Sequence, residues 1–134
     1  PLKQELNYIE NFLKLQSLQY ANENLVEYNV KGNPDDIRIA PMLFIPFIEN
    51  AFKHSTNKEK EYVIKIIFDI NDQLLTFTSV NEADKEQIIS KDKSSGVGLD
   101  IVKRRLELLY PDKYKLEIKE ENNLFNVLLT IELR

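Results

Sequence analysis

The chain has 134 residues, of which 43% are hydrophobic and 30% charged, and its formal net charge is -4. This length and apolar content suit one globular domain with a sizeable core. The acidic balance argues against a nucleic-acid or anionic-membrane surface, because either would require a concentrated basic patch. The chain contains no cysteine, so disulfides and thiolate metal sites are excluded. Its apolar runs are far shorter than the roughly 20 residues of a membrane-spanning helix.

Residues 1–20 predict a helix with a wide apolar side. The stripe consists of Leu2, Leu6, Ile9 and Leu13, with Tyr8, Phe12, Leu15 and Tyr20 beside or beyond it. Because this side is wide, we expect part of it to pack on something outside the chain, either an upstream helix or a second copy. The alternative is an ordinary terminal helix docked on its own domain.

Several later segments have the alternation and the β-branched or aromatic content of strands. Residues 25–30 predict a strand that leaves through a turn, and 62–70 with 74–80 predict an antiparallel hairpin. A second hairpin is predicted within residues 114–133, with its turn at Glu121–Asn123. Residues 81–95 are polar and weakly periodic, which at this length indicates a functional loop.

The segment "PMLFIPFIENAFKHS" predicts a short helical turn from Pro41 and a main helix whose first residue is near Pro46, because proline fits only the first turn of a helix. At about 100° per residue, one arc of roughly 140° carries four polar side chains. They are Glu49, Asn50, Lys53 and His54, opposite the apolar Phe47, Ile48, Ala51 and Phe52.

This polar arc has two interpretations. An asparagine oxygen suits Mg²⁺, a lysine supplies a mobile charge for phosphate, and a neutral imidazole can bond a phosphate oxygen or the last carbonyls of the helix. The alternative is a solvated helix face with Glu49 and Lys53 as an ordinary i,i+4 pair.

A second candidate site is "SSGVGLDIV", where Gly96 and Gly98 precede a predicted amphipathic helix. Glycines allow close approach to a ligand, and a helix start offers free N–H groups and partial positive charge, so the pattern is typical of a phosphate cradle. A simple tight turn is the alternative, and the third glycine of the dinucleotide fingerprint is absent.

Together these segments resemble a known family. "PMLFIPFIENAFKHS" is similar to the asparagine box of the histidine-kinase type of ATP-binding domain. "SSGVGLDIVKRRLELLYPDKYKLEI" is similar to its second glycine box and following helix, in the form found in LytS-type sensor kinases of bacteria. The resemblance covers essentially the whole chain. It implies an α+β fold of Bergerat type, a two-layer α/β sandwich with a mixed, mainly antiparallel sheet and helices on one face.

The resemblance also implies the site. ATP lies between the helices under a lid formed by residues 82–95, with Mg²⁺ coordinated by Asn50 and with Glu49 orienting or polarising groups at the reacting phosphate. Glu49 and Asn50 are thus the catalytic pair. The remaining nucleotide contacts implied are the side chains of Lys53 and His54 and the backbone of Gly96, Val97, Gly98 and Leu99.

Two departures from the family pattern matter. The family uses an Asp followed by glycines to accept the adenine amino group, whereas this chain has Asn81 without a glycine, and a neutral acceptor is weaker by roughly twofold. No Pro-His-Phe-like phosphoacceptor motif occurs, and His54 belongs to the nucleotide box. We therefore expect the chain to bind ATP but not to complete autophosphorylation by itself.

The resemblance predicts a domain division and a function. Residues 1–21 would end a dimerisation and phosphoacceptor hairpin, and residues 22–134 would form the ATP-binding catalytic domain. The whole protein would be a membrane-anchored bacterial homodimer with this part in the cytoplasm. It would pass phosphate to a response regulator of the LytTR type. The alternatives are a non-catalytic scaffold, or an ATPase of gyrase-like or chaperone-like type; residues 103–110 favour the sensor kinase over the latter.

Overall fold

A computed structural model describes residues 1–22, 24–54, 63–82 and 99–133. Its helices and strands follow in the order α1 (Leu2–Gln19), β1 (Val26–Lys31), α2 (Ile45–His54), β2 (Ile64–Asn71), β3 (Leu74–Glu82), β4 (Tyr114–Glu121) and β5 (Leu124–Glu132). A further helix covers residues 99–109, between β3 and β4.

The described strands form one five-stranded sheet in the order β1-β2-β3-β5-β4. Both predicted hairpins are confirmed, since β2 pairs antiparallel with β3 and β4 with β5. β3 also pairs antiparallel with β5, whereas β1 runs parallel to β2. Parallel neighbours need a crossover, and α2 lies in the segment that connects β1 to β2. The sheet is therefore mixed and mainly antiparallel, as expected.

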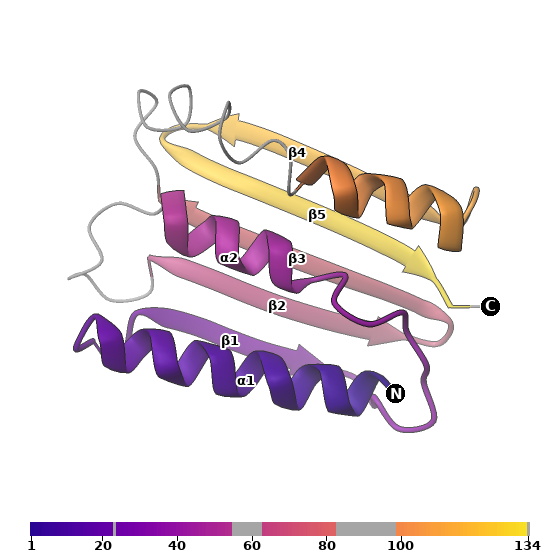
Figure 1. Cartoon of the computed structure of the whole chain (residues 1–134), viewed down its shortest axis with the longest axis horizontal. Coiled ribbons are helices and arrows are strands. Elements are labelled where there is room, and N and C mark those ends of the chain that lie inside the picture. The colour runs from indigo at the N-terminus through magenta and orange to yellow at the C-terminus, as the bar shows by residue number, and fades with distance from the viewer. Residues whose placement is uncertain (23, 55–62, 83–98, 134) are drawn as a thin grey trace.

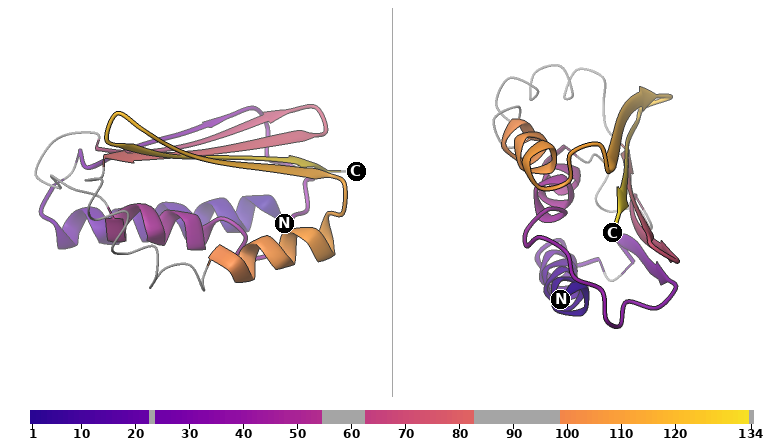
Figure 2. Two further views of the ribbon diagram at one scale, coloured as in Figure 1. Left: turned by 90° about the horizontal axis from the view of Figure 1, so that it is seen from above. Right: turned by 90° about the vertical axis from the view of Figure 1, so that its right-hand side faces the viewer.

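The described helices all lie on one face of the sheet, which confirms the predicted two-layer α+β sandwich (Figures 1 and 2). α1 lies over the β1 edge, α2 lies over the middle of the sheet, and residues 99–109 lie over the β5 and β4 side (Figure 1). α2 and the helix over residues 99–109 are far apart in the sequence, and in this layer they are neighbours.

An aromatic cluster joins α2 to the sheet. Phe44 lies 5.0 Å from Phe68 and 5.2 Å from Phe77, measured between ring centroids, and Phe47 lies 6.1 Å from Phe77. All four rings are buried. Such pairs add roughly 0.5–1.5 kcal/mol each beyond the area they bury, so this cluster holds α2 firmly on β2 and β3.

α1 is docked on its own domain through the predicted stripe. Leu2, Leu6, Ile9 and Leu13 are buried in the common core, and Phe12 contacts Phe52 of α2 edge to face. The rest of the apolar side is open, since Tyr8, Leu15 and Leu18 are 51%, 66% and 75% exposed. The docking alternative is therefore confirmed for one side of the helix. The further partner expected for the other side stays a prediction.

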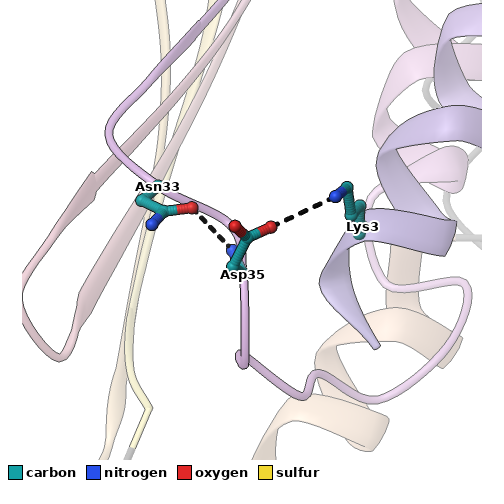
Figure 3. Close-up of polar contacts among 3 residues, drawn as sticks. All are labelled: Lys3, Asn33 and Asp35. Atoms are coloured by element: carbon teal, nitrogen blue, oxygen red, sulfur yellow. Dashed lines mark hydrogen bonds and ion pairs between the residues drawn. The ribbon is translucent and has the colours of Figure 1, made fainter.

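Polar contacts hold the start of α1 to the loop after β1 (Figure 3). Lys3 Nζ lies 3.3 Å from Asp35 Oδ1, and the Asp35 N–H donates to Asn33 Oδ1 at 3.0 Å. The loop begins at Gly32, whose φ is +93° and where a Cβ would lie 2.1 Å from the Ile70 carbonyl oxygen. Glycine is required there, because any side chain would collide with the neighbouring strand.

The segment before α2 differs from its prediction. Residues 41–44 form turns and bends rather than a helical turn, and Met42 has φ 61°. α2 itself begins at Ile45, next to Pro46, which agrees with the predicted start near Pro46. None of the described helices is long and apolar enough to cross a membrane.

Candidate functional site

α2 divides the four polar residues that were expected to share one face. Glu49 and Lys53 are exposed, whereas Asn50 is buried with only 7% of its surface accessible. His54 is the last residue of α2, and its side chain lies outside the described residues. The prediction of a single polar face is therefore wrong for Asn50. Asn50 lies at the border of the apolar arc of α2, and α2 packs so closely on the sheet that the sheet covers this border as well as the arc.

Asn81 is also buried, and it belongs to β3 rather than to the loop predicted from residue 81 onward. It is 0% exposed and pairs in register with Ile64 of β2 and Phe125 of β5. The strand continues because neighbours on both sides satisfy its backbone. Asn81 shares the helix-covered face of β3 with Ser79, which is buried as well.

The side-chain amide of Asn81 is only half satisfied. Its Nδ2 donates to the carbonyl oxygen of Glu82 at 3.3 Å. Its Oδ1 is buried and has no hydrogen-bond partner among the described residues. Leaving a buried acceptor unpaired costs about 1–3 kcal/mol, so this oxygen is a place where a ligand's N–H or O–H group would be stabilising.

Asn50 and Asn81 belong to elements that end at the same side of the sheet. The C-terminal ends of α2 and β3 lie together there (Figure 1), and β3 is the strand that α2 contacts most. Asn50 lies in the second half of α2, and Asn81 is the next-to-last residue of β3. The fold thus brings two buried amides from distant segments to one region of the helix-covered face.

Arg105, in the helix over residues 99–109, and Tyr110, directly after that helix, hold the turn that precedes α2. Arg105 donates from Nη1 to the Met42 carbonyl at 3.2 Å and from Nη2 to the Pro41 carbonyl at 2.6 Å. The Ala40 N–H donates to Tyr110 Oη at 3.0 Å. A guanidinium suits this task because its donors form a rigid fork. The helix over residues 99–109 and the entry to α2 are therefore joined directly.

These contacts of Arg105 and Tyr110 with residues 40–42, here called the clamp, are not predicted by the sequence, although residues 103–110 carry part of the family resemblance. One signal was available. A turn between Pro41 and Pro46 leaves carbonyl oxygens without local N–H partners, and such groups need donors from elsewhere in the chain. The sequence does not indicate which cation supplies them.

The amino-acid sequence of the chain is similar to those of proteins named LytS. No family model matches the chain. "Sensor protein LytS" of Staphylococcus haemolyticus is 27% identical over an alignment of 129 residues, and the alignment covers 88% of this chain and 22% of that protein. LytS of Bacillus subtilis is 23% identical over an alignment of 133 residues, and the alignment covers 90% of this chain and 22% of the relative. The chain thus spans less than a quarter of the length of these relatives.

Solved structures agree on the architecture. The catalytic domain of histidine kinase ThkA superposes with a TM-score of 0.66 at 16% identity, covering 98% of this chain and 93% of that chain. The blue-light activated histidine kinase EL346 of Erythrobacter litoralis gives a TM-score of 0.65 at 14% identity, covering 95% and 41% of the two chains. This is a LytS-like sequence on the fold of a histidine-kinase catalytic domain. The predicted resemblance and fold class are both confirmed.

The glycine segment of this histidine-kinase fold is not tested by the structure. Gly96, Val97 and Gly98 lie outside the described residues, as do residues 83–95 of the expected lid. Leu99 opens the described part of the following helix and packs partly buried against the core. The phosphate cradle therefore stays a prediction.

The expected metal site also stays a prediction. No group of three or more His, Asp or Glu side chains that could hold a metal ion occurs within the described ranges. Among those ranges the assignment of Mg²⁺ depends on Asn50, whose amide oxygen is the kind of hard ligand that this ion accepts beside substrate phosphates.

Proposed function

We propose that this chain is the ATP-binding catalytic domain of a two-component sensor histidine kinase. It would donate the γ-phosphoryl group of ATP to a histidine on a dimerisation helix, and His54, the one histidine of this chain, is not proposed as that acceptor. The observation that carries the proposal is that two buried amides, Asn50 and Asn81, belong to elements that end at the same side of the sheet in a histidine-kinase fold.

The described side chains have distinct proposed roles. Asn50 would hold Mg²⁺, and the chemistry that this ion would supply is neutralisation of the charge on the phosphates. Glu49 is exposed beside it and would orient groups at the reacting phosphate. Lys53, also exposed, and His54 would face the nucleotide phosphates, and Asn81 Oδ1 would accept a hydrogen bond from the adenine amino group.

Backbone groups complete the proposed site. The N–H groups of Gly96, Val97, Gly98 and Leu99 would surround the phosphates. Residue 82, which was expected to begin the lid, is the last residue of β3, so residues 83–95 would form the lid. Phosphoryl transfer is catalysed mainly by positioning and charge stabilisation, so a metal ligand, cations and a backbone cradle are sufficient parts.

The longer protein is proposed to be a membrane-anchored bacterial homodimer that signals to a response regulator of the LytTR type. Its LytS relatives are named as sensor proteins, which supports a sensing role for the whole chain. Residues 1–21 would be the end of the dimerisation and phosphoacceptor hairpin, and residues 22–134 the cytoplasmic catalytic domain. α1 would then serve both parts, since its inner side belongs to the domain core.

The proposal is tested by titrating the fragment with Mg-ATP in a calorimeter. We expect the wild type to bind and Asn50→Ala to lose at least about tenfold in affinity, because a metal ligand or a phosphate-orienting amide is removed. Asn50→Asp is expected to lose binding or transfer activity as well. The matched control is Asn7→Ala, an exposed asparagine of α1. Thermal unfolding of each variant separates lost binding from lost folding.

Equal affinity of the wild type and Asn50→Ala would contradict the role of Asn50. One observation favours the scaffold alternative, namely the neutral Asn81 in the place where the family has an ionised acceptor. A wild-type fragment that is folded but does not bind Mg-ATP would support that alternative and reject the kinase.

A further inference from the structure

Within the part of the chain that the structure describes, the side-chain amide of Asn81 has a donor that is hydrogen-bonded and an acceptor that is not. Its Nδ2 donates to the Glu82 carbonyl at 3.3 Å, slightly beyond the usual range of about 2.7–3.2 Å for such bonds. Its Oδ1 is fully buried and has no partner among the described residues. The amide is therefore held by one weak bond, and its buried acceptor is unpaired among the described residues, so a ligand N–H group that reached it would be stabilised.

The surroundings limit what that ligand group can be. Ile64 and Phe125 are the register neighbours of Asn81, and both are buried apolar residues. A phosphate oxygen is itself an acceptor and would be repelled by Oδ1. An uncharged flat ring with an N–H at its edge fits both the apolar neighbours and the free acceptor. Within the proposed function, the purine base is the part of the nucleotide that has this chemistry.

We propose that Asn81 makes this site permissive at the purine 6-position, so that it accepts 6-oxo purine triphosphates as well as ATP. The inference depends on the proposed nucleotide site. A 6-amino purine donates to Oδ1 in the orientation seen here. A 6-oxo purine presents an acceptor instead, and the amide can answer it by turning through 180° so that Nδ2 donates.

Turning the Asn81 amide costs free energy, and this cost sets how strongly the site prefers the 6-amino purine to the 6-oxo purine. Turning breaks the weak bond from Nδ2 to Glu82 and brings Oδ1 toward the Glu82 carbonyl oxygen. One such neutral bond corresponds to about a tenfold change in affinity. A carboxylate at this position would have no donor to offer and would reject the 6-oxo group far more strongly, because buried acceptors would then face one another.

The test is a calorimetric titration of the fragment with the Mg²⁺ salts of ATP and inosine triphosphate, which carries oxygen at the 6-position and no 2-amino group. We expect the wild type to prefer ATP by about tenfold or less. In Asn81→Asp this preference is expected to rise above about a hundredfold. Asn126→Asp is the matched control, because Asn126 lies on β5 beside Val80 at a position that faces the other side of the sheet.

Asn81→Leu, which removes both the donor and the acceptor, guards against a misfolded Asp variant. It should bind both nucleotides more weakly than the wild type and with nearly equal affinity. A wild-type preference for ATP above about a hundredfold would overturn the inference while leaving the proposed function intact, and so would undiminished ATP binding by Asn81→Leu. If the folded wild type binds neither nucleotide, the proposed function fails and the inference fails with it.

Discussion

At the residue scale, Tyr28 shows how the fold changes the chemistry of one side chain. Its ring lies partly buried on β1 and contacts Phe68 edge to face at 6.4 Å. Burial, and secondarily the negative charge of Glu10, raise the pKa of the Tyr28 phenol from 10.0 to about 12. Both causes disfavour the ionised form, so the folded chain holds this phenol neutral to a higher pH than the unfolded chain does.

This shift predicts a loss of stability in alkaline solution. The contribution of Tyr28 is fully present below pH 10, the unfolded pKa, and is lost as the pH rises through the folded pKa of about 12. Over this pH range we expect the free energy of unfolding of Tyr28→Phe to fall by about 1 kcal/mol less than that of the wild type. This value is discounted because the phenol is only partly buried. Denaturant unfolding measured at several pH values checks this. Tyr8→Phe, at an exposed phenol, should decline as the wild type does.

At the element scale, the clamp on residues 40–42 joins three helices. Arg105 and Tyr110, which follow this segment in the chain, make hydrogen bonds to its backbone. Glu5 of α1 accepts a further hydrogen bond from the Met42 N–H at 3.2 Å. Because α2 starts immediately afterwards, the clamp sets where that helix begins and hence where Asn50 lies. Arg105 and Tyr110 are thus positioning residues for the proposed site.

Weakening the clamp should destabilise the domain. Tyr110→Phe leaves the Ala40 N–H without its partner, and Arg105→Lys loses the forked contact to two carbonyls. We expect each to lower the free energy of unfolding by about 1 kcal/mol, and the double variant to deviate from additivity because the two contacts share one turn. Arg104→Lys, at an exposed neighbour, should remain within about 0.5 kcal/mol of the wild type in the same denaturation series.

At the scale of the whole molecule, one side of the sandwich carries unused apolar surface. A groove of about 720 Å³ runs between α1 and β1, with Leu13, Leu18 and Tyr28 in its lining. Among the described strands β1 pairs only with β2, so it is an edge of the sheet. Exposed apolar groups beside an open strand edge are typical of surfaces that meet another chain.

We therefore predict self-association through residues 1–20. Replacing Leu15 and Leu18 by glutamate should shift a concentration-dependent dimer to monomer in sedimentation experiments, because both side chains are largely exposed in the single chain. Leu108→Glu is the control, since Leu108 is 74% exposed on a different helix. A wild-type fragment that remains monomeric at high concentration would remove this prediction for the fragment.

Local patterns explain which elements were predictable. The hairpins follow from period-2 alternation and from turn residues that tolerate positive φ, as Asp72, Asn122 and Asn123 do with φ of 59°, 52° and 63°. The buried stripe of α1 follows from helical periodicity. The family resemblance was also legible in the sequence, because its motifs combine specific residues at specific spacings. These local patterns predict whether each element is a helix or a strand and which of its sides is apolar.

By itself, the amino-acid sequence determined the order of the elements, the two hairpins, the fold class and the residue types of the proposed site. Only the tertiary structure decided that Asn50 is buried rather than solvated, that Asn81 lies within a strand with an unpaired oxygen, and that Arg105 joins two distant segments. The physical reason is that burial and hydrogen-bond pairing depend on which element covers which. That information belongs to contacts between segments and to no single segment.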